Sequence, residues 1–110
     1  HLRNVRVRQR RRRDALLAGL REHLPQARVE GVAAGLHLLI TLPGTDDDTV
    51  LAERIAVTGV RVHPLSWHRH RPGVPGLVMG YAAHTPDRLT EAAARIGRAL
   101  RTTTAGFTAP

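Results

Sequence analysis

The sequence predicts an α+β domain, a two-layer sandwich in which helices pack on one face of a small, mostly antiparallel sheet of about four strands. Three observations predict this fold class. The chain has 110 residues, a one-domain length that buries roughly two-thirds of the unfolded surface. Short apolar runs bounded by Gly and Pro, typical of strands, are mixed with stretches whose apolar residues recur at helical spacing. Hydrophobic residues make up 42% of the chain, which excludes a disordered composition, and no apolar run approaches the roughly 20 residues of a membrane span.

The first element is a helix expected from Leu2 to Leu24. In its second half Leu16, Leu20 and Leu24 lie four residues apart and form an apolar stripe, and Pro25 ends the helix. Its first half differs, because arginines surround it and few apolar residues accompany them. These arginines are Arg3, Arg6, Arg8, Arg10, Arg11, Arg12 and Arg13. This half therefore cannot bury much apolar surface by itself.

Two strands are expected next. Residues 28–32 alternate between polar and apolar and predict a short strand. The run from Gly35 to Pro43 is the most apolar stretch of the chain, and its length and borders indicate a strand buried on both faces. Such a strand needs cover, which the helices before and after it supply. His37 within it is expected to be a hydrogen-bonded core histidine.

The second half of the chain is expected to contain a helix, two more strands and a last helix. A helix is expected from Thr45 or Asp46 to about Thr58, because acidic residues in its first turn suit the helix dipole. Gly59 suits the position just past its end. Strands follow at residues 60–62 and 77–82, separated by an irregular segment, residues 63–76, that contains three prolines.

The last helix is expected to begin at Pro86, with Thr85 as its cap. Its apolar residues follow helical spacing closely as far as Leu100. Residues 102–110 have no periodicity. We therefore expect residues 1–101 to form the domain and residues 102–110 to form a flexible tail.

Composition excludes several kinds of chemistry. The chain has no cysteine, which excludes disulfides and cysteine-ligated zinc. Its aromatic content of 3% argues against a surface that stacks nucleic-acid bases. All 17 basic residues are arginines, so there is no lysine amine for covalent attachment of an aldehyde cofactor.

The run Arg10, Arg11, Arg12 and Arg13 is the strongest electrostatic feature of a chain with a net charge of +8. One interpretation is phosphate contact with nucleic acid. The other is a solvated helix, or a helix docked on an acidic surface. No helix-turn-helix, aromatic stack or Gly-rich clamp accompanies the run, and both interpretations stay open.

The irregular segment invites a metal hypothesis through His63, His68 and His70. Arginines flank these histidines and oppose a cation, and no carboxylate lies in the segment, so we predict a solvated or substrate-facing loop and no metal site. The three aspartates at 46–48 lack the spacing of a calcium loop. Ser66 lacks the acid and the Gly-x-Ser-x-Gly context of a serine nucleophile.

Four segments, in this order and spacing, resemble the C-terminal small domain of MocR-type regulators. These are GntR-family bacterial transcriptional regulators with an effector domain like a class I/II aminotransferase. The segments are Arg10–Leu17 (RRRRDALL), Ala34–Leu38 (AGLHL), Gly59–Ser66 (GVRVHPLS) and Gly76–Ala82 (GLVMGYA). The resemblance covers His1 to about Leu100.

The resemblance implies that this chain, which opens on His1 and not on Met, is part of a longer cytoplasmic protein. The parent would carry an N-terminal winged helix domain that binds DNA, followed by a fold-type I domain that binds pyridoxal phosphate on a lysine outside this chain. It would form a homodimer and respond to a small-molecule effector. The small domain would close over the cofactor site, with the segment from Pro64 to Pro75 at its nearest approach. The effector-site residues expected there are Ser66, Trp67, His68, Arg69 and Arg71.

One departure from the family pattern bears on activity. Aminotransferases of this fold usually place an arginine on the strand before the last helix, where it pairs with the substrate carboxylate. Here Leu77, Val78 and Met79 take that place, and the nearest arginine upstream is Arg71. The missing arginine weakens the transaminase interpretation and favours a sensor. The family's aromatic pair after Pro-Leu-Ser appears here as Trp67 and His68, which leaves the role of the loop open.

We therefore expect no catalytic or cofactor-binding residue in this chain, and at most weak or vestigial aminotransferase activity in the parent. Two alternatives stay open. One is the small domain of a genuine pyridoxal phosphate-dependent aminotransferase. The other is a stand-alone basic module that binds nucleic acid through the arginines between Arg3 and Arg13.

Overall fold

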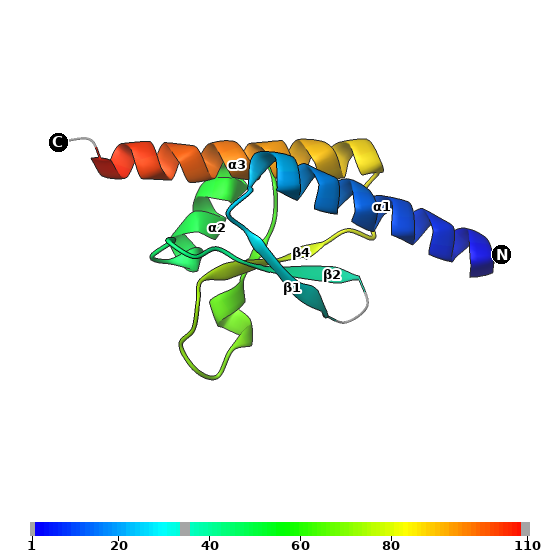
Figure 1. Cartoon of the computed structure of the whole chain (residues 1–110), viewed down its shortest axis with the longest axis horizontal. Coiled ribbons are helices and arrows are strands. Elements are labelled where there is room, and N and C mark those ends of the chain that lie inside the picture. The colour runs from blue at the N-terminus through cyan, green and yellow to red at the C-terminus, as the bar shows by residue number, and fades with distance from the viewer. Residues whose placement is uncertain (1, 34–35, 109–110) are drawn as a thin grey trace.

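Three helices cover one face of a four-stranded antiparallel sheet in the computed structural model, which describes residues 2–33 and 36–108 (Figure 1). The strand order is β1-β2-β4-β3. The elements are α1 (Leu2–His23), β1 (Arg28–Ala33), β2 (His37–Thr41), α2 (Asp48–Val57), β3 (His63–Pro64), a 3₁₀ turn η1 (Leu65–His68), β4 (Gly76–Gly80) and α3 (Pro86–Thr108). The predicted fold class is confirmed.

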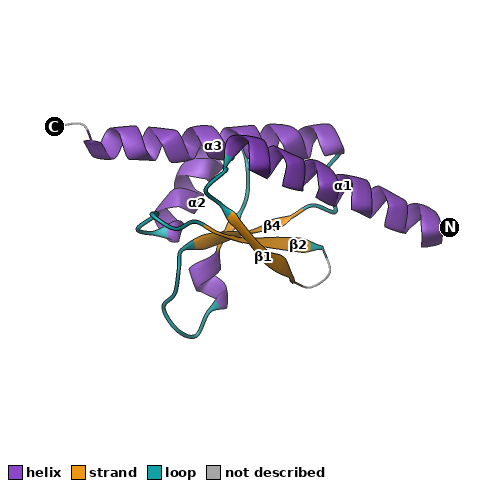
Figure 2. Ribbon diagram, viewed as in Figure 1, coloured by secondary structure: helices purple, strands orange, loops and turns teal. Residues whose placement is uncertain are grey.

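The sheet is built around β2 and β4. In the antiparallel register Leu38 lies opposite Met79, and Ile40 lies opposite Leu77. All four of these side chains are buried in the core against the helices. Because successive strand residues point to opposite faces, the residues between them point away from α1, α2 and α3. These three long helices lie on one side of the sheet in Figure 2.

The core is almost entirely aliphatic, as the low aromatic content requires. The leucine stripe of α1 meets the sheet and the apolar faces of α2 and α3, and the predicted helical spacings are confirmed. The buried residues include Leu16, Leu20, Leu24, Leu38, Ile40, Leu42, Leu51, Ile55, Leu77, Met79, Tyr81, Leu89, Ala93 and Ile96.

Helices α1 and α3 pack closely because small residues face each other where they meet. A Cβ atom on Gly19 of α1 would lie 2.8 Å from the Cβ atom of Ala93 on α3. A Cβ atom on Gly97 of α3 would lie 2.7 Å from the backbone oxygen of His23 on α1. Both distances are shorter than a van der Waals contact, so these positions accept glycine only unless the helices move apart.

The third strand differs from its prediction. A strand at residues 60–62 was expected, but β3 consists of His63 and Pro64, which lie opposite Val78 and Leu77. The prediction was wrong because alternation alone does not secure a partner: ladder pairing with β4 ends at His63, and residues 60–62 pair with no strand of the described residues. Val60 and Val62 pack instead against the core as half-buried side chains.

Other local predictions need correction. The N-cap of α2 is Asp47, one or two residues later than expected. His37 is exposed and not a core histidine, because it starts β2 on the uncovered face. The expected burial of this strand on both faces holds only in part: Leu39 is half-buried, whereas Thr41 is buried and donates to Glu30 Oε1 at 2.7 Å. The expected strand start at residue 35 lies outside the described residues.

Helices α1 and α3 lie at the two ends of the described part of the chain. Helix α3 begins at Pro86 as predicted, and the Thr85 hydroxyl accepts from the backbone N–H of Arg88 at 3.3 Å. It continues to Thr108, through most of the segment assigned to a tail from the sequence. Within residues 2–33 and 36–108 no helix is long and apolar enough to cross a membrane.

Replacing Gly97 by valine tests the close α1–α3 contact. We expect Gly97→Val to lower the free energy of unfolding by about 2 kcal/mol, because the new side chain overpacks against the backbone of His23. Arg101→Val is the control, since it places the same β-branched residue at an exposed position of α3. Urea unfolding followed by circular dichroism measures both. An equal effect of the two substitutions would contradict the close contact.

Candidate functional site

A buried carboxyl group ties the irregular segment to α2. Asp48, the first residue of α2, is only 3% exposed. Its Oδ1 atom accepts a hydrogen bond from the Ser66 hydroxyl at 2.6 Å. Its Oδ2 atom accepts from the backbone N–H of Ser66 and from that of Gly76, each at 3.1 Å. One side chain therefore fixes both ends of the segment that separates β3 from β4.

The neighbouring Asp47 explains why Asp48 is available for this role. Asp47 caps α2: its Oδ1 atom accepts from the backbone N–H of Thr49 at 2.9 Å and also from the Thr49 hydroxyl. These bonds, the hydroxyl bond first, lower the pKa of Asp47 below its ordinary value. Because the cap is supplied by the preceding residue, Asp48 can turn inward to the loop.

The segment held by Asp48 first forms the 3₁₀ turn η1. Leu65 is buried and anchors the turn, whereas Trp67 is 67% exposed. The ring of His63 lies 5.7 Å from that of Trp67 and is stacked 5.8 Å from that of His68. The three rings form an exposed aromatic cluster beside the end of β3. Figure 2 shows this turn below the sheet, away from the three long helices.

The rest of the loop folds back through Arg69. Its Nη1 atom donates to the backbone oxygen of Val74 and closes the loop upon itself. A hollow of about 390 Å³ lies between this loop and the start of α2. Its lining residues are Asp46, Asp47, Asp48, Ser66, Arg69, His70, Arg71, Pro72, Gly73 and Pro75.

The structure therefore divides the predicted effector-site residues into two groups. Ser66, Arg69 and Arg71 line the hollow, whereas Trp67 and His68 belong to the aromatic cluster. Sequence analysis missed the aspartates on the facing wall, because an acidic first turn was already explained by helix capping. The signal that could have revealed Asp48 was a second acidic residue at the start of α2, beyond the one that the N-cap needs.

The hollow carries opposite charges on its two walls but no catalytic pair. Arg69 and Arg71 can receive a carboxylate on one wall. On the other wall Asp47 and Asp48 already accept hydrogen bonds from the protein itself. The Ser66 hydroxyl donates to Asp48, and no hydrogen bond joins it to a histidine in the described part of the chain. Among residues 2–33 and 36–108 no three His, Asp or Glu side chains are grouped to hold a metal ion.

The arginine run on α1 does not behave as one unit. Arg10 and Arg11 are exposed, together with Arg3, Arg6 and Arg8. Arg12 is half-buried and donates to Gln9 at 3.4 Å, and half-buried Arg13 lies 3.9 Å from a carboxylate oxygen of Asp14. The N-terminal part of α1 extends beyond the first turn of α3 in Figure 1. The exposed arginines are therefore open to an anionic partner.

Comparison with solved structures identifies the fold. The kynurenine aminotransferase of Pyrococcus horikoshii, in complex with PMP, is similar at a TM-score of 0.82 and 24% identity over 94% of this chain and 26% of that chain. LysN, the α-aminoadipate aminotransferase of Thermus thermophilus, complexed with N-(5′-phosphopyridoxyl)-L-leucine, is similar at a TM-score of 0.82 and 24% identity. That match covers 94% of this chain and 27% of LysN. The aspartate aminotransferase of Thermus thermophilus is similar at a TM-score of 0.61 and 27% identity, over 86% of this chain and 23% of that chain.

The chain thus spans about a quarter of the length of these solved structures. It has the fold of an aminotransferase small domain. No family model matches the sequence. A search of curated proteins gives no match either.

Removing the Asp48 carboxyl group tests its role in the loop. We expect Asp48→Ala to lower the free energy of unfolding by about 2–4 kcal/mol, because two backbone N–H groups lose their acceptor. Amide hydrogen exchange at Ser66 and Gly76 should also accelerate. Asp46→Ala is the control, because it removes an exposed carboxyl group just before α2. It should change the free energy of unfolding by less than about 0.5 kcal/mol. If amide hydrogen exchange at Ser66 and Gly76 stayed unchanged in Asp48→Ala, the conclusion that Asp48 holds the loop would be contradicted.

Proposed function

We propose that this chain is the small lobe of a pyridoxal phosphate-binding, aminotransferase-like effector domain in a bacterial DNA-binding transcriptional regulator of the MocR type. The aminotransferase small-domain fold supports the effector-domain part of the proposal. The four segments that resemble the MocR family support the regulator part. Since the chain spans about a quarter of the solved aminotransferases, the activity and partners of the whole protein are part of the proposal.

One observation supports a sensor over an enzyme. Strand β4 reads Gly-Leu-Val-Met-Gly and carries no cation. Leu77 and Met79 are buried in the core, so the strand offers no guanidinium for a substrate carboxylate. In transaminases such an arginine supplies bidentate recognition, and its absence removes a main source of affinity for an amino-acid substrate.

The chain's own residues do not fit covalent attachment of the cofactor. Pyridoxal phosphate needs a lysine amine, and the sequence contains none. The cofactor would therefore be held elsewhere in the parent. This lobe would contribute the loop tied by Asp48, with Ser66, Arg69 and Arg71 turned toward the effector and Trp67 and His68 excluding water. The parent would be a cytoplasmic homodimer that contacts DNA through a winged helix domain.

A genuine aminotransferase remains the main rival, because the solved structures compared above are all aminotransferases. The uncharged β4 strand argues against it. A stand-alone nucleic-acid module is the second rival, and the exposed arginines of α1 argue for it. It predicts that the 110-residue chain alone binds duplex DNA tightly, with affinity that falls steeply as salt rises.

The test is made on the product of the complete native gene. We expect a yellow protein whose colour borohydride bleaches, which binds the DNA upstream of its own gene and does not transaminate at an appreciable rate. Bleachable colour with rapid transamination and no DNA binding would support the aminotransferase instead. A colourless protein would reject both, and salt-sensitive DNA binding by the 110-residue chain alone would then favour the basic module.

A further inference from the structure

A second hollow, of about 490 Å³, lies between α3 and the segment 59–62. This volume falls within the range of small-molecule sites, roughly 300–1,000 Å³. Its origin is the early end of the β3–β4 ladder. Continuing the register of His63 opposite Val78 would place Val62 opposite Met79, but pairing stops at His63. Both Val62 and Met79 line the hollow that opens where the two segments separate.

The inner surface of this hollow is apolar. It is lined by buried core side chains and by three half-buried ones, Val60, Val62 and Ala92, which provide most of its accessible apolar surface. The buried ones are Leu16, Met79, Leu89 and Ile96. An apolar group that enters such a surface gains about 25 cal/mol of free energy for each Å² removed from water.

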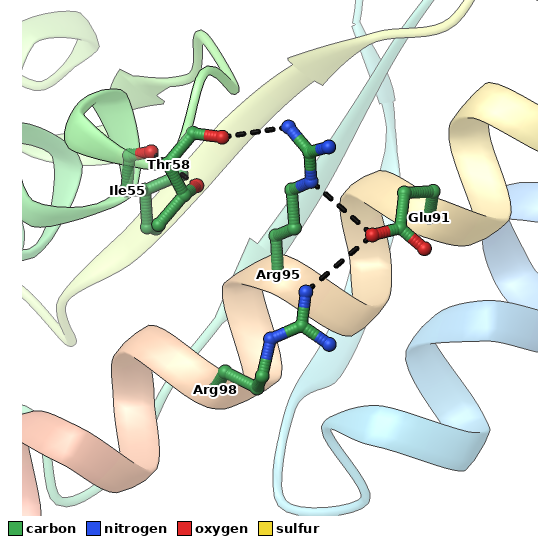
Figure 3. A network of polar contacts seen from close by, with 5 residues as sticks. All are labelled: Ile55, Thr58, Glu91, Arg95 and Arg98. Atoms are coloured by element: carbon green, nitrogen blue, oxygen red, sulfur yellow. Dashed lines mark hydrogen bonds and ion pairs between the residues drawn. The ribbon is translucent and has the colours of Figure 1, made fainter.

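One wall of the hollow is stiffened by a polar network, shown in Figure 3. Arg95 of α3 donates to the backbone oxygen of Thr58 at 2.7 Å and to Glu91 Oε1 at 3.2 Å. Arg98 donates to the same Glu91 oxygen at 3.4 Å. The network fastens the end of α2 to α3, so the path of residues 59–62, and with it the hollow, is held in place.

The network also decides the charge that the hollow presents. The hydrogen bond from Arg95, followed by that from Arg98, lowers the pKa of Glu91 below its ordinary value of 4.5, against the opposing effect of desolvation. Glu91 is therefore ionised at neutral pH, and its charge is already matched by two arginines. It is a poor receptor for a ligand's ammonium group.

The rim carries two cationic side chains that are not paired with a carboxylate of the described residues. Arg61 and Arg88 line the hollow from opposite sides, one from the segment 59–62 and one from the first turns of α3. Within residues 2–33 and 36–108, neither guanidinium makes a hydrogen bond or an ion pair.

We infer that this hollow binds a small carboxylic acid with an apolar body. The body would occupy the aliphatic surface, and the carboxylate would meet Arg61 and Arg88 at the rim. An amino acid fits less well, because the carboxylate of Glu91 is already paired with Arg95 and Arg98. This site shares no lining residue with the loop hollow, and the inference does not depend on the proposed function.

The test titrates the 110-residue chain with 3-phenylpropionate and, as a neutral isostere, 3-phenylpropionamide. Binding is followed by calorimetry and by ¹⁵N–¹H NMR. We expect saturable shifts at the amides of Val60, Val62 and Ala92, and about tenfold weaker binding of the amide, since it loses a charge-assisted hydrogen bond. Absence of saturable shifts at these residues, or equal affinity for acid and amide, would overturn the inference.

Variants separate the site from general charge attraction. Arg61→Gln and Arg88→Gln should each weaken binding of the acid about tenfold and leave the amide unaffected. Arg54→Gln removes the same charge from an exposed position of α2 outside the hollow and should have no effect. Ala92→Leu fills the hollow and should abolish binding of both ligands while the chain stays folded. Equal weakening by Arg54→Gln, or unchanged binding in Ala92→Leu, would contradict the site.

Discussion

The buried carboxyl group of Asp48 is the constraint on which the loop between β3 and β4 depends. A polar group removed from water must be hydrogen-bonded, and Asp48 finds its donors only at Ser66 and Gly76 within the described residues. These two residues lie at opposite ends of the loop between β3 and β4. Satisfying one side chain therefore closes the loop, sets the start of β4 and forms the hollow that Arg69 and Arg71 line.

A second constraint acts on the opposite layer. Helices α1 and α3 touch through Gly19 and Gly97, so their apolar faces reach the sheet as one surface. The Arg95 network then fastens α2 to this pair through the backbone oxygen of Thr58. The three long helices therefore cover one face of the sheet as a single layer. The loop between β3 and β4 and the aromatic cluster lie on the other side.

Sequence patterns predicted the helices and the central strands well, because leucine spacing in α1 and α3 and the apolar run in β2 report burial directly. They failed at residues 60–62, where alternation was present but no strand of the described residues pairs with the segment. They also missed the role of Asp48, since its donors lie 18 and 28 residues away. Contacts at such separations leave no periodic trace in a single sequence.

We propose that the loop from Pro64 to Pro75 faces the cofactor and effector in the complete protein. Hydrogen–deuterium exchange of the complete native protein, measured with and without pyridoxal phosphate, tests this orientation. We expect the cofactor to slow exchange in peptides that cover this loop and to leave the exposed face of α3 unchanged. Unchanged exchange in the loop, with protection confined to the helical layer, would contradict it.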